Sequence, residues 1–260
     1  MNLVVVLLSC LVAVTVLMTV VALVARSIGR VVIVDVAWGG GFVVLALVAA
    51  LTGTNDLRWW LLVMVALWGG RLAWHVGQRV LATDEEDPRY ATLLEDKPFS
   101  YAVVRVFLTQ GVAMWFVSLP VQVAASTDTS TWSGLVWIGS ALWVVGLAFE
   151  TIGDRQLAAY RREPRESRPK VMDQGLWHYT RHPNYFGDAC VWWGVWLVGA
   201  GASGAALATV LSPVVMSYFL VFATGAKLLE KTMMQREGYP EYVERTSMFF
   251  PLPPKKTPVS

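Results

Sequence analysis

Long apolar runs separated by short polar segments dominate the pattern of this chain. A helix needs about 20 consecutive apolar residues to cross the hydrocarbon core of a bilayer, and several of the runs reach that length. The pattern therefore predicts an all-α, polytopic membrane protein with seven transmembrane helices. The predicted spans are residues 3–25, 31–52, 59–77, 101–124, 133–152, 186–201 and 205–224.

The first run, from Leu3 to Ala25, has no basic residue in front of it. A signal peptide would have a basic leader and an apolar core of only about 7–15 residues. We therefore predict that this run is a retained first span.

The distribution of Lys and Arg predicts the orientation of the spans. With the N-terminus outside, all but one of the 21 basic residues lie on the inner side, and Arg58 is the exception. Cytoplasmic loops carry such an excess, so we expect a cytoplasmic C-terminus. The polar segments 78–100, 153–185 and 226–260 are then all cytoplasmic, and the last ends in a proline-rich tail that we expect to be loose.

The composition supports a membrane protein and excludes several classes. The chain is 55% hydrophobic and 15% charged, with a mean hydropathy of +0.50, which is more apolar than a soluble core of this size requires. The basic residues lie where topology alone requires them, so nucleic-acid binding is not expected. The two cysteines, Cys10 and Cys190, lie at or within apolar runs, which leaves no disulfide framework and no CxxC metal site.

Metal and nucleotide motifs are equally sparse. His178 and His182 are four residues apart, but no carboxylate lies between them and Pro183 interrupts a helix there; we expect no metal site. No phosphate-binding loop of the Walker type and no G-x-G-x-x-G after a strand occurs. The small residues Gly39–Gly41 and Ala66–Gly69–Gly70–Ala73 are expected instead to allow close packing of their spans against other helices.

Polar residues inside spans are rarer and more informative. Asp35 lies near the start of the second span, and Arg71, His75 and Arg79 repeat every four residues in and just after the third. Two interpretations stay open for them: a functional site, or snorkelling and mutual pairing, such as Asp35 with Arg71. Further polar residues of this kind are Gln110, Glu150 and Asp154.

Two cytoplasmic segments also allow two interpretations each. The basic loop 161–170, which contains Arg162, suits the 2′-phosphate of a nucleotide, or is simply a loop on the positive side. The segment from Tyr239 to Thr246, which contains Tyr242, is either an aromatic belt beside the membrane or a lid whose tyrosines cover a cofactor.

The densest group of ionisable residues lies in the segment Gly175–Asp188, GLWHYTRHPNYFGD. This segment resembles the signature of the steroid 5α-reductase and sterol reductase superfamily, and above all its bacterial branch. Weaker matches extend the resemblance over most of the chain: Asp35-x-x-Trp38-Gly39, Trp68-x-x-Arg71-Leu72, Phe149-Glu150-x-x-x-Asp154-x-Gln156 and Gly238-Tyr239-x-x-Tyr242-x-x-x-Thr246-x-x-Phe249.

The resemblance implies a seven-helix fold in a bacterial inner membrane, with an active site facing the cytoplasm. Residues 126–260 would form the half that binds NADPH, and residues 1–125 an apolar half that admits a lipid from the bilayer. The implied cofactor-binding residues are Glu150, Asp154, Arg181, His182, Asn184, Tyr185 and Asp188, to which the phosphate-binding and lid interpretations above add Arg162, Tyr239 and Tyr242.

The implied reaction is hydride transfer from NADPH to the C=C bond of a steroid-like or other lipid enone. The protein must then stabilise the negative charge that develops on the carbonyl oxygen, and Asp35 and Arg71 are the candidate catalytic residues. The family uses an acid and a tyrosine for this task. Here the expected tyrosine position is Trp68, whose indole is a donor but not a useful acid.

Two other functions stay open. Isoprenylcysteine and phospholipid methyltransferases share a similar RHP-x-Y motif and use S-adenosylmethionine in place of NADPH. The missing tyrosine also allows a non-catalytic relative that only binds lipid.

Overall fold

The computed structural model describes residues 3–126, 132–223 and 225–255. Within these ranges the chain is helical and contains no β-strand, which confirms the all-α prediction. Six helical runs are long and apolar enough to cross a membrane, and they support an integral membrane protein. These runs are Leu3–Ile28, Ile33–Thr52, Arg58–Leu81, Phe99–Val117, Ser133–Arg162 and Gly204–Met233.

The sixth predicted span, 186–201, corresponds to the 20-residue helix α9 (Pro183–Ala202), which is not one of these six runs. None of the residues of α9 is exposed. A helix that is covered by neighbouring protein can contain tryptophan, glycine and polar residues that a lipid-facing helix would exclude. The count of seven spans and the side on which each terminus lies stay predictions.

The chain forms two compact units. Unit 1 comprises Met1–Trp137 and Val195–Ser212, and unit 2 comprises Ile138–Gly194 and Pro213–Ser260. The predicted division of function between residues 1–125 and 126–260 stays a prediction.

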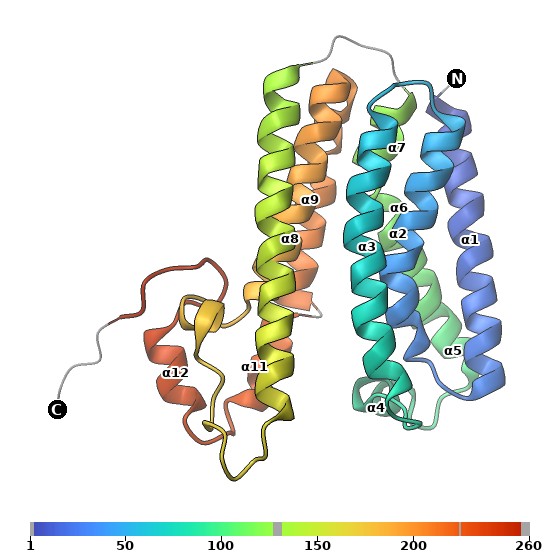
Figure 1. Ribbon diagram of the computed structural model, residues 1–260. Helices are drawn as coiled ribbons and strands as arrows, with labels where there is room; N and C mark the ends of the chain where they lie inside the picture. Colours follow the sequence, from blue (N-terminus) through green and yellow to red (C-terminus); the bar gives the residue numbers. More distant parts are fainter. Residues whose placement is uncertain (1–2, 127–131, 224, 256–260) are drawn as a thin grey trace. The chain divides into compact units, whose positions relative to one another are not determined.

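Unit 1 is a bundle built on α1, α2, α3 and the segment from α5 to α7 (Figure 1). Gly39 of α2 packs against Gly69 of α3 so closely that a Cβ on either would lie 2.5 Å from a backbone oxygen of the other. The prediction that these small residues allow close approach is confirmed. The elements are α1 (Leu3–Ile28), α2 (Ile33–Thr52), α3 (Arg58–Leu81), α4 (Pro88–Leu94), α5 (Phe99–Ala102), the π-helix η1 (Val103–Leu108), α6 (Thr109–Val117) and α7 (Leu119–Ser126).

The predicted fourth span, 101–124, is not one continuous α-helix. A π-helical segment, η1, follows its first turn, and the chain breaks again at Ser118 between α6 and α7. Pro120 explains the second break, because a proline lacks the N–H and clashes with the carbonyl four residues before it. The predicted fifth span, 133–152, lies within helix α8, which continues to Arg162 and ends before Pro164.

Unit 2 is built on the antiparallel pair α8 (Ser133–Arg162) and α9, which lie side by side in Figure 1. Glycines on both helices bring the two backbones together: Gly194 packs on Gly139, Gly187 on Gly146, and Gly153 on Pro183. The contacts recur every seven residues along α8, which fixes the register of the pair. The other elements of unit 2 are η2 (Gly175–His178), most of α10 (Leu211–Tyr218), η4 (Phe219–Ala223), α11 (Ala226–Met233) and α12 (Tyr239–Arg245), whereas η3 (Gly204–Thr209) belongs to unit 1.

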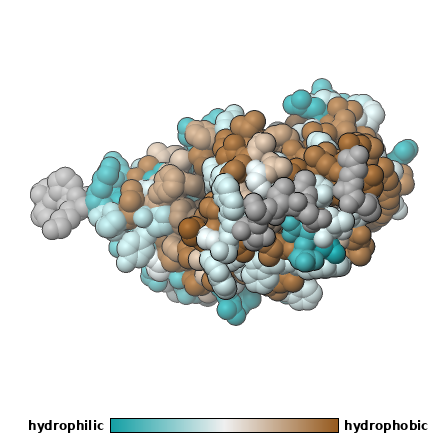
Figure 2. Space-filling model, turned by 90° about the horizontal axis from the view of Figure 1, so that it is seen from above, coloured by the Kyte–Doolittle hydropathy of each residue, from teal (hydrophilic) through white to brown (hydrophobic). Residues whose placement is uncertain are grey.

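Large apolar side chains are exposed on the apolar helices, among them Val12, Leu51 and Ile138. Figure 2 shows apolar residues over much of the face it presents, with polar residues in smaller patches. Such a surface would aggregate in water and is suited to lipid.

Candidate functional site

The first polar cluster lies in unit 1, around Asp35 in the first turn of α2. Tyr90 of α4 donates a hydrogen bond to Oδ1 of Asp35 at 2.5 Å, and Arg89 donates to Oδ2 at 2.7 Å. Gln110 of α6 donates to the hydroxyl of Tyr90 at 3.3 Å. We call these four residues, Asp35, Arg89, Tyr90 and Gln110, the Asp35 cluster.

Local sequence signals place Tyr90 there. Asp87 caps α4 by accepting a hydrogen bond from the backbone N–H of Arg89, and Pro88 occupies the first turn, as is usual at helix starts. Glu86 accepts hydrogen bonds from the backbone N–H groups of Val31 and Val32. The loop before α4 is therefore tied to the start of the helix that carries Asp35.

The electrostatics of the cluster keep the phenol protonated. Burial raises the pKa of Tyr90, and the neighbouring Asp35 charge raises it further. The side-chain hydrogen bond from Arg89 lowers the pKa of Asp87, against a smaller opposing effect of burial. The cluster thus presents a neutral O–H donor held between a carboxylate and an amide.

This arrangement corrects the expectation that Asp35 has no tyrosine beside it. The tyrosine comes from a short helix after the third span, 55 residues from Asp35 in the chain. Trp68, at the position where a tyrosine was expected, is completely buried. Arg71, the other candidate catalytic residue, and His75 are both half-buried on α3, and Arg79 is exposed.

A second polar cluster lies in unit 2, between α8 and α9. Glu150 and Asp154 are buried one turn apart on α8, and Asp188 is buried on α9. Asn184, one turn before Asp188, donates to Oδ1 of Asp154 at 3.2 Å. The side-chain oxygen of Asn184 is buried and accepts no hydrogen bond from the residues that the structure describes.

The glycine register of the helix pair brings these residues together. A Cβ on Gly187 would lie 2.5 Å from the backbone nitrogen of Glu150, and one on Gly153 would lie 3.3 Å from that of Asn184. The indole N–H of Trp177 fixes the preceding loop by donating to the carbonyl of Gly153 at 3.0 Å. Four predicted cofactor residues, Glu150, Asp154, Asn184 and Asp188, therefore lie on two adjoining helices.

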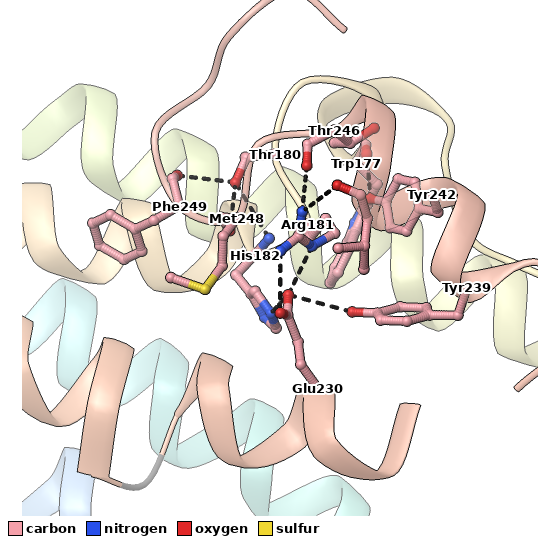
Figure 3. Close-up of polar contacts among 11 residues, drawn as sticks. Trp177, Thr180, Arg181, His182, Glu230, Tyr239, Tyr242, Thr246, Met248 and Phe249 are labelled. Atoms are coloured by element: carbon pink, nitrogen blue, oxygen red, sulfur yellow. Dashed lines mark hydrogen bonds and ion pairs between the residues drawn. The ribbon is translucent and has the colours of Figure 1, made fainter. Parts of the chain in front are cut away.

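Arg181 and His182 belong to a different group, centred on Glu230 of α11 (Figure 3). Arg181 makes a two-pronged ion pair with Glu230, at 2.7 Å from Nε and 3.1 Å from Nη2. His182 lies 3.1 Å from the same carboxylate, and the hydroxyl of Tyr239 lies 3.5 Å from it. Glu230 was not among the predicted site residues.

The remaining contacts of Arg181 are with the backbone. Its Nη1 donates to the carbonyls of Val243 and Thr246, so four of the five N–H donors of the guanidinium are used. Its side chain is only 7% exposed. Arg181 therefore joins α11, α12 and the start of α9, and little of it remains to contact a phosphate.

The chain after α12 is also held by this group, which corrects the prediction of a loose tail. Thr180 donates to the carbonyls of Met248 and Phe249, and the backbone N–H of Leu252 donates to Tyr179. Residues 246–255 thus pack against the loop before α9, and Pro258 lies outside the described residues.

Tyr242 and Tyr185, two other predicted residues, lie beside this group, whereas Arg162 makes no hydrogen bond or ion pair with it among the described residues. Tyr242 is 1% exposed and donates to the carbonyl of Trp177, and burial raises its pKa and that of Tyr239. The ring of Tyr185 stacks on His182, with centroids 5.4 Å apart. Arg162 is exposed at the end of α8. No group of three or more His, Cys, Asp or Glu side chains in the described ranges could hold a metal.

The fold and these clusters define a helical membrane protein with a cluster of acids and amides in each of two units. The chain belongs to the family described as protein of unknown function (DUF1295), whose model matches residues 21–246. No curated protein and no solved structure matched the chain.

Proposed function

We propose that this protein is a membrane-embedded, NADPH-dependent reductase of a C=C bond in a steroid-like or other lipid enone. The observation that carries the proposal is the pairing of Tyr90 with Asp35. A neutral phenol oriented by a carboxylate can stabilise the enolate that enone reduction forms, and an acid with a tyrosine is the pair that the resemblance to steroid 5α-reductases implies.

The chemistry assigns roles to three members of the Asp35 cluster. Bound NADPH would supply a hydride to the carbon β to the carbonyl. The C=C electron pair then moves towards the carbonyl oxygen, where the Tyr90 hydroxyl, turned from Asp35 to the substrate, would donate its hydrogen bond to the developing enolate. A proton from water added at the α-carbon completes the product, and Asp35 and Arg89 orient the phenol between turnovers.

The cluster on α8 and α9 fits the polar parts of the cofactor. The side-chain oxygen of Asn184 is a buried acceptor, which suits the N–H of a carboxamide, and buried acceptors of this kind are costly unless they are used. The carboxylates of Glu150, Asp154 and Asp188 can accept hydrogen bonds from ribose hydroxyls.

The phosphates require cations that are accessible. Arg162 is exposed and lies in the basic loop 161–170, so we assign it, and not Arg181, to the 2′-phosphate. His182, Tyr185, Tyr239 and Tyr242 would then act indirectly, by holding the segment that carries Asn184. In this proposal the site faces the cytoplasm of a bacterial inner membrane.

Ligand-induced stabilisation tests the proposal against the methyltransferase alternative. A ligand at about 100 times its Kd stabilises the folded state by about 2.7 kcal/mol. We expect NADPH, but not S-adenosylmethionine, to raise the Tm of the purified protein in detergent. Asn184→Ala should remove the effect, whereas His178→Ala, at an exposed position of the same segment, should keep it. Stabilisation by S-adenosylmethionine alone would refute the reductase proposal.

A further inference from the structure

An apolar groove runs along unit 1 between α1 and the segment from α5 to α6, with a volume of about 650 Å³. On α1 its lining residues recur every three or four positions from Leu11 to Arg26, so they form one stripe of the helix. On the other wall the lining extends from Phe99 to Val112. No member of the Asp35 cluster lines the groove, which is therefore separate from the proposed reaction site.

The groove has a closed floor and an open rim. Met18 of α1 is 5% exposed and Phe107 of η1 is 2% exposed, and both lie on the floor. Leu23, Leu108 and Val112 are exposed at the rim. Because α1 is long and apolar enough to cross a membrane, an open rim along it faces the lipid.

We call the apolar length of the groove along α1 its shaft. The polar side chains there already have hydrogen-bond partners. Thr15 and Thr19 donate their hydroxyl hydrogens to carbonyls one turn earlier in α1, each at 2.8 Å. Their hydroxyls are thus engaged by their own helix, and the shaft is suited to a hydrocarbon.

One end of the groove differs from the rest. Arg26, in the last turn of α1, is the only charged residue of the lining, and Ser100 lies at the same end. The guanidinium of Arg26 lies 5.9 Å from the centre of the Phe99 ring. A cation at the end of an otherwise apolar groove complements an anionic head group.

The dimensions of the groove favour a single acyl chain. The lining of α1 from Leu11 to Arg26 covers about 22 Å at 1.5 Å per residue, which exceeds the roughly 15 Å of one half of the hydrocarbon core. Dividing the volume by this length gives a cross-section of about 30 Å², which admits one chain but not two abreast, because non-bonded carbons stay about 3.5–4.0 Å apart.

We propose that this groove binds an anionic phospholipid, with one acyl chain along α1 and the phosphate beside Arg26. The π-helical turn of η1 forms part of the wall, and such turns are frequent at functional sites. Binding at this site is independent of NADPH.

Native mass spectrometry of the delipidated full-length protein tests this proposal with two probes, dioleoyl phosphatidylglycerol and dioleoyl phosphatidylcholine. We expect one tightly bound phosphatidylglycerol and about fivefold weaker phosphatidylcholine, since a cation near the membrane surface contributes about 1 kcal/mol. Arg26→Gln should remove this difference, whereas Arg105→Gln should keep it, because Arg105 is an exposed cation of η1 outside the lining.

A second pair of variants tests the groove itself. Thr15→Trp should weaken phosphatidylglycerol binding at least tenfold by filling the shaft. Val16→Trp is the matched control, because Val16 is the next residue and is exposed but does not line the groove. Equal affinity for both lipids in the unsubstituted protein, or unchanged binding in Thr15→Trp, would overturn the proposal.

Discussion

The hydroxyl oxygen of Tyr90 lies 2.5 Å from Oδ1 of Asp35, although the two residues are 55 positions apart. Tyr90 is 8% exposed, and burial keeps its phenol protonated. The pair therefore holds a neutral donor at a fixed position beside a carboxylate, which is the basis of the proposed reaction.

Replacing Tyr90 by Phe removes this donor and keeps the ring. We expect kcat for enone reduction to fall by about 10²-fold, the usual cost of losing one donor to a developing oxyanion, with little change in NADPH affinity. Steady-state kinetics and NADPH-dependent stabilisation measure the two effects. Tyr101→Phe is the control, because Tyr101 lies on α5 outside the cluster. Equal losses of kcat in Tyr90→Phe and Tyr101→Phe would contradict the role assigned to Tyr90.

The cap of α4 predicts a pH dependence. The pKa of Asp87 is lowered, first by the hydrogen bond from Arg89, so its charged form stabilises the fold. That stability is fully present above the unfolded pKa of about 3.9 and is lost as the pH falls through the folded pKa.

We therefore compare the Tm of the unsubstituted protein with that of Asp87→Asn, which keeps an acceptor for the cap but removes the charge. The unsubstituted protein should be the more stable at neutral pH, and the difference should close below about pH 4. A difference that persists in acid would mean that cap geometry, and not charge, is responsible.

The ion pair of Arg181 with Glu230 should determine the stability of unit 2. Glu230→Gln leaves a buried guanidinium without a counter-charge, which costs about 3–5 kcal/mol. We expect a lower Tm and faster trypsin cleavage after Arg245, because residues 246–255 are held by the same group.

The control for this variant is the exposed ion pair of Lys170 with Glu237, whose side chains are 64% and 75% exposed. Exposed pairs contribute little, so Glu237→Gln should leave both measurements unchanged. Similar cleavage rates in Glu230→Gln and the unsubstituted protein would show that Arg181 does not hold the C-terminal segment.

The glycine contacts between α8 and α9 give a fourth prediction. A Cβ on Gly146 would lie 2.5 Å from the carbonyl oxygen of Gly187, whereas one on Gly134 would meet nothing within 4 Å. Gly146→Ala should destabilise the protein by about 1–3 kcal/mol and weaken NADPH binding, because it separates Asp154 from Asn184. Gly134→Ala on the same helix should be neutral or slightly stabilising. A Gly146→Ala variant with unchanged stability would contradict the close packing of α8 against α9.

Local patterns in the sequence predicted those features that depend on neighbouring residues. Apolar runs located α1, α2 and α3, and the small residues around Gly39 and Gly69 predicted a close contact that the structure contains. The break at Pro120 and the extension of α8 to Arg162 were also detectable, since proline and good helix formers act locally, but they were not predicted.

Contacts between distant segments were not predictable in the same way. The sequence Asp87-Pro88 indicates the start of a short helix, yet nothing in it shows that Tyr90 contacts Asp35. Glu230 lies in an ordinary run of charged and apolar residues, and only the fold shows that it pairs with Arg181. The proline-rich tail appeared loose because its hydrogen bonds are made by Tyr179 and Thr180, about 70 residues earlier.

Transfer of label from NADPH to product tests the central claim most directly. Membranes containing the protein are incubated with NADPH deuterated at the transferable position and with a panel of steroid and prenyl enones. We predict a saturated ketone that carries one deuterium at the β-carbon, and loss of this product in Tyr90→Phe but not in Tyr101→Phe. NADPH binding without deuterium in any product of the panel would contradict the account.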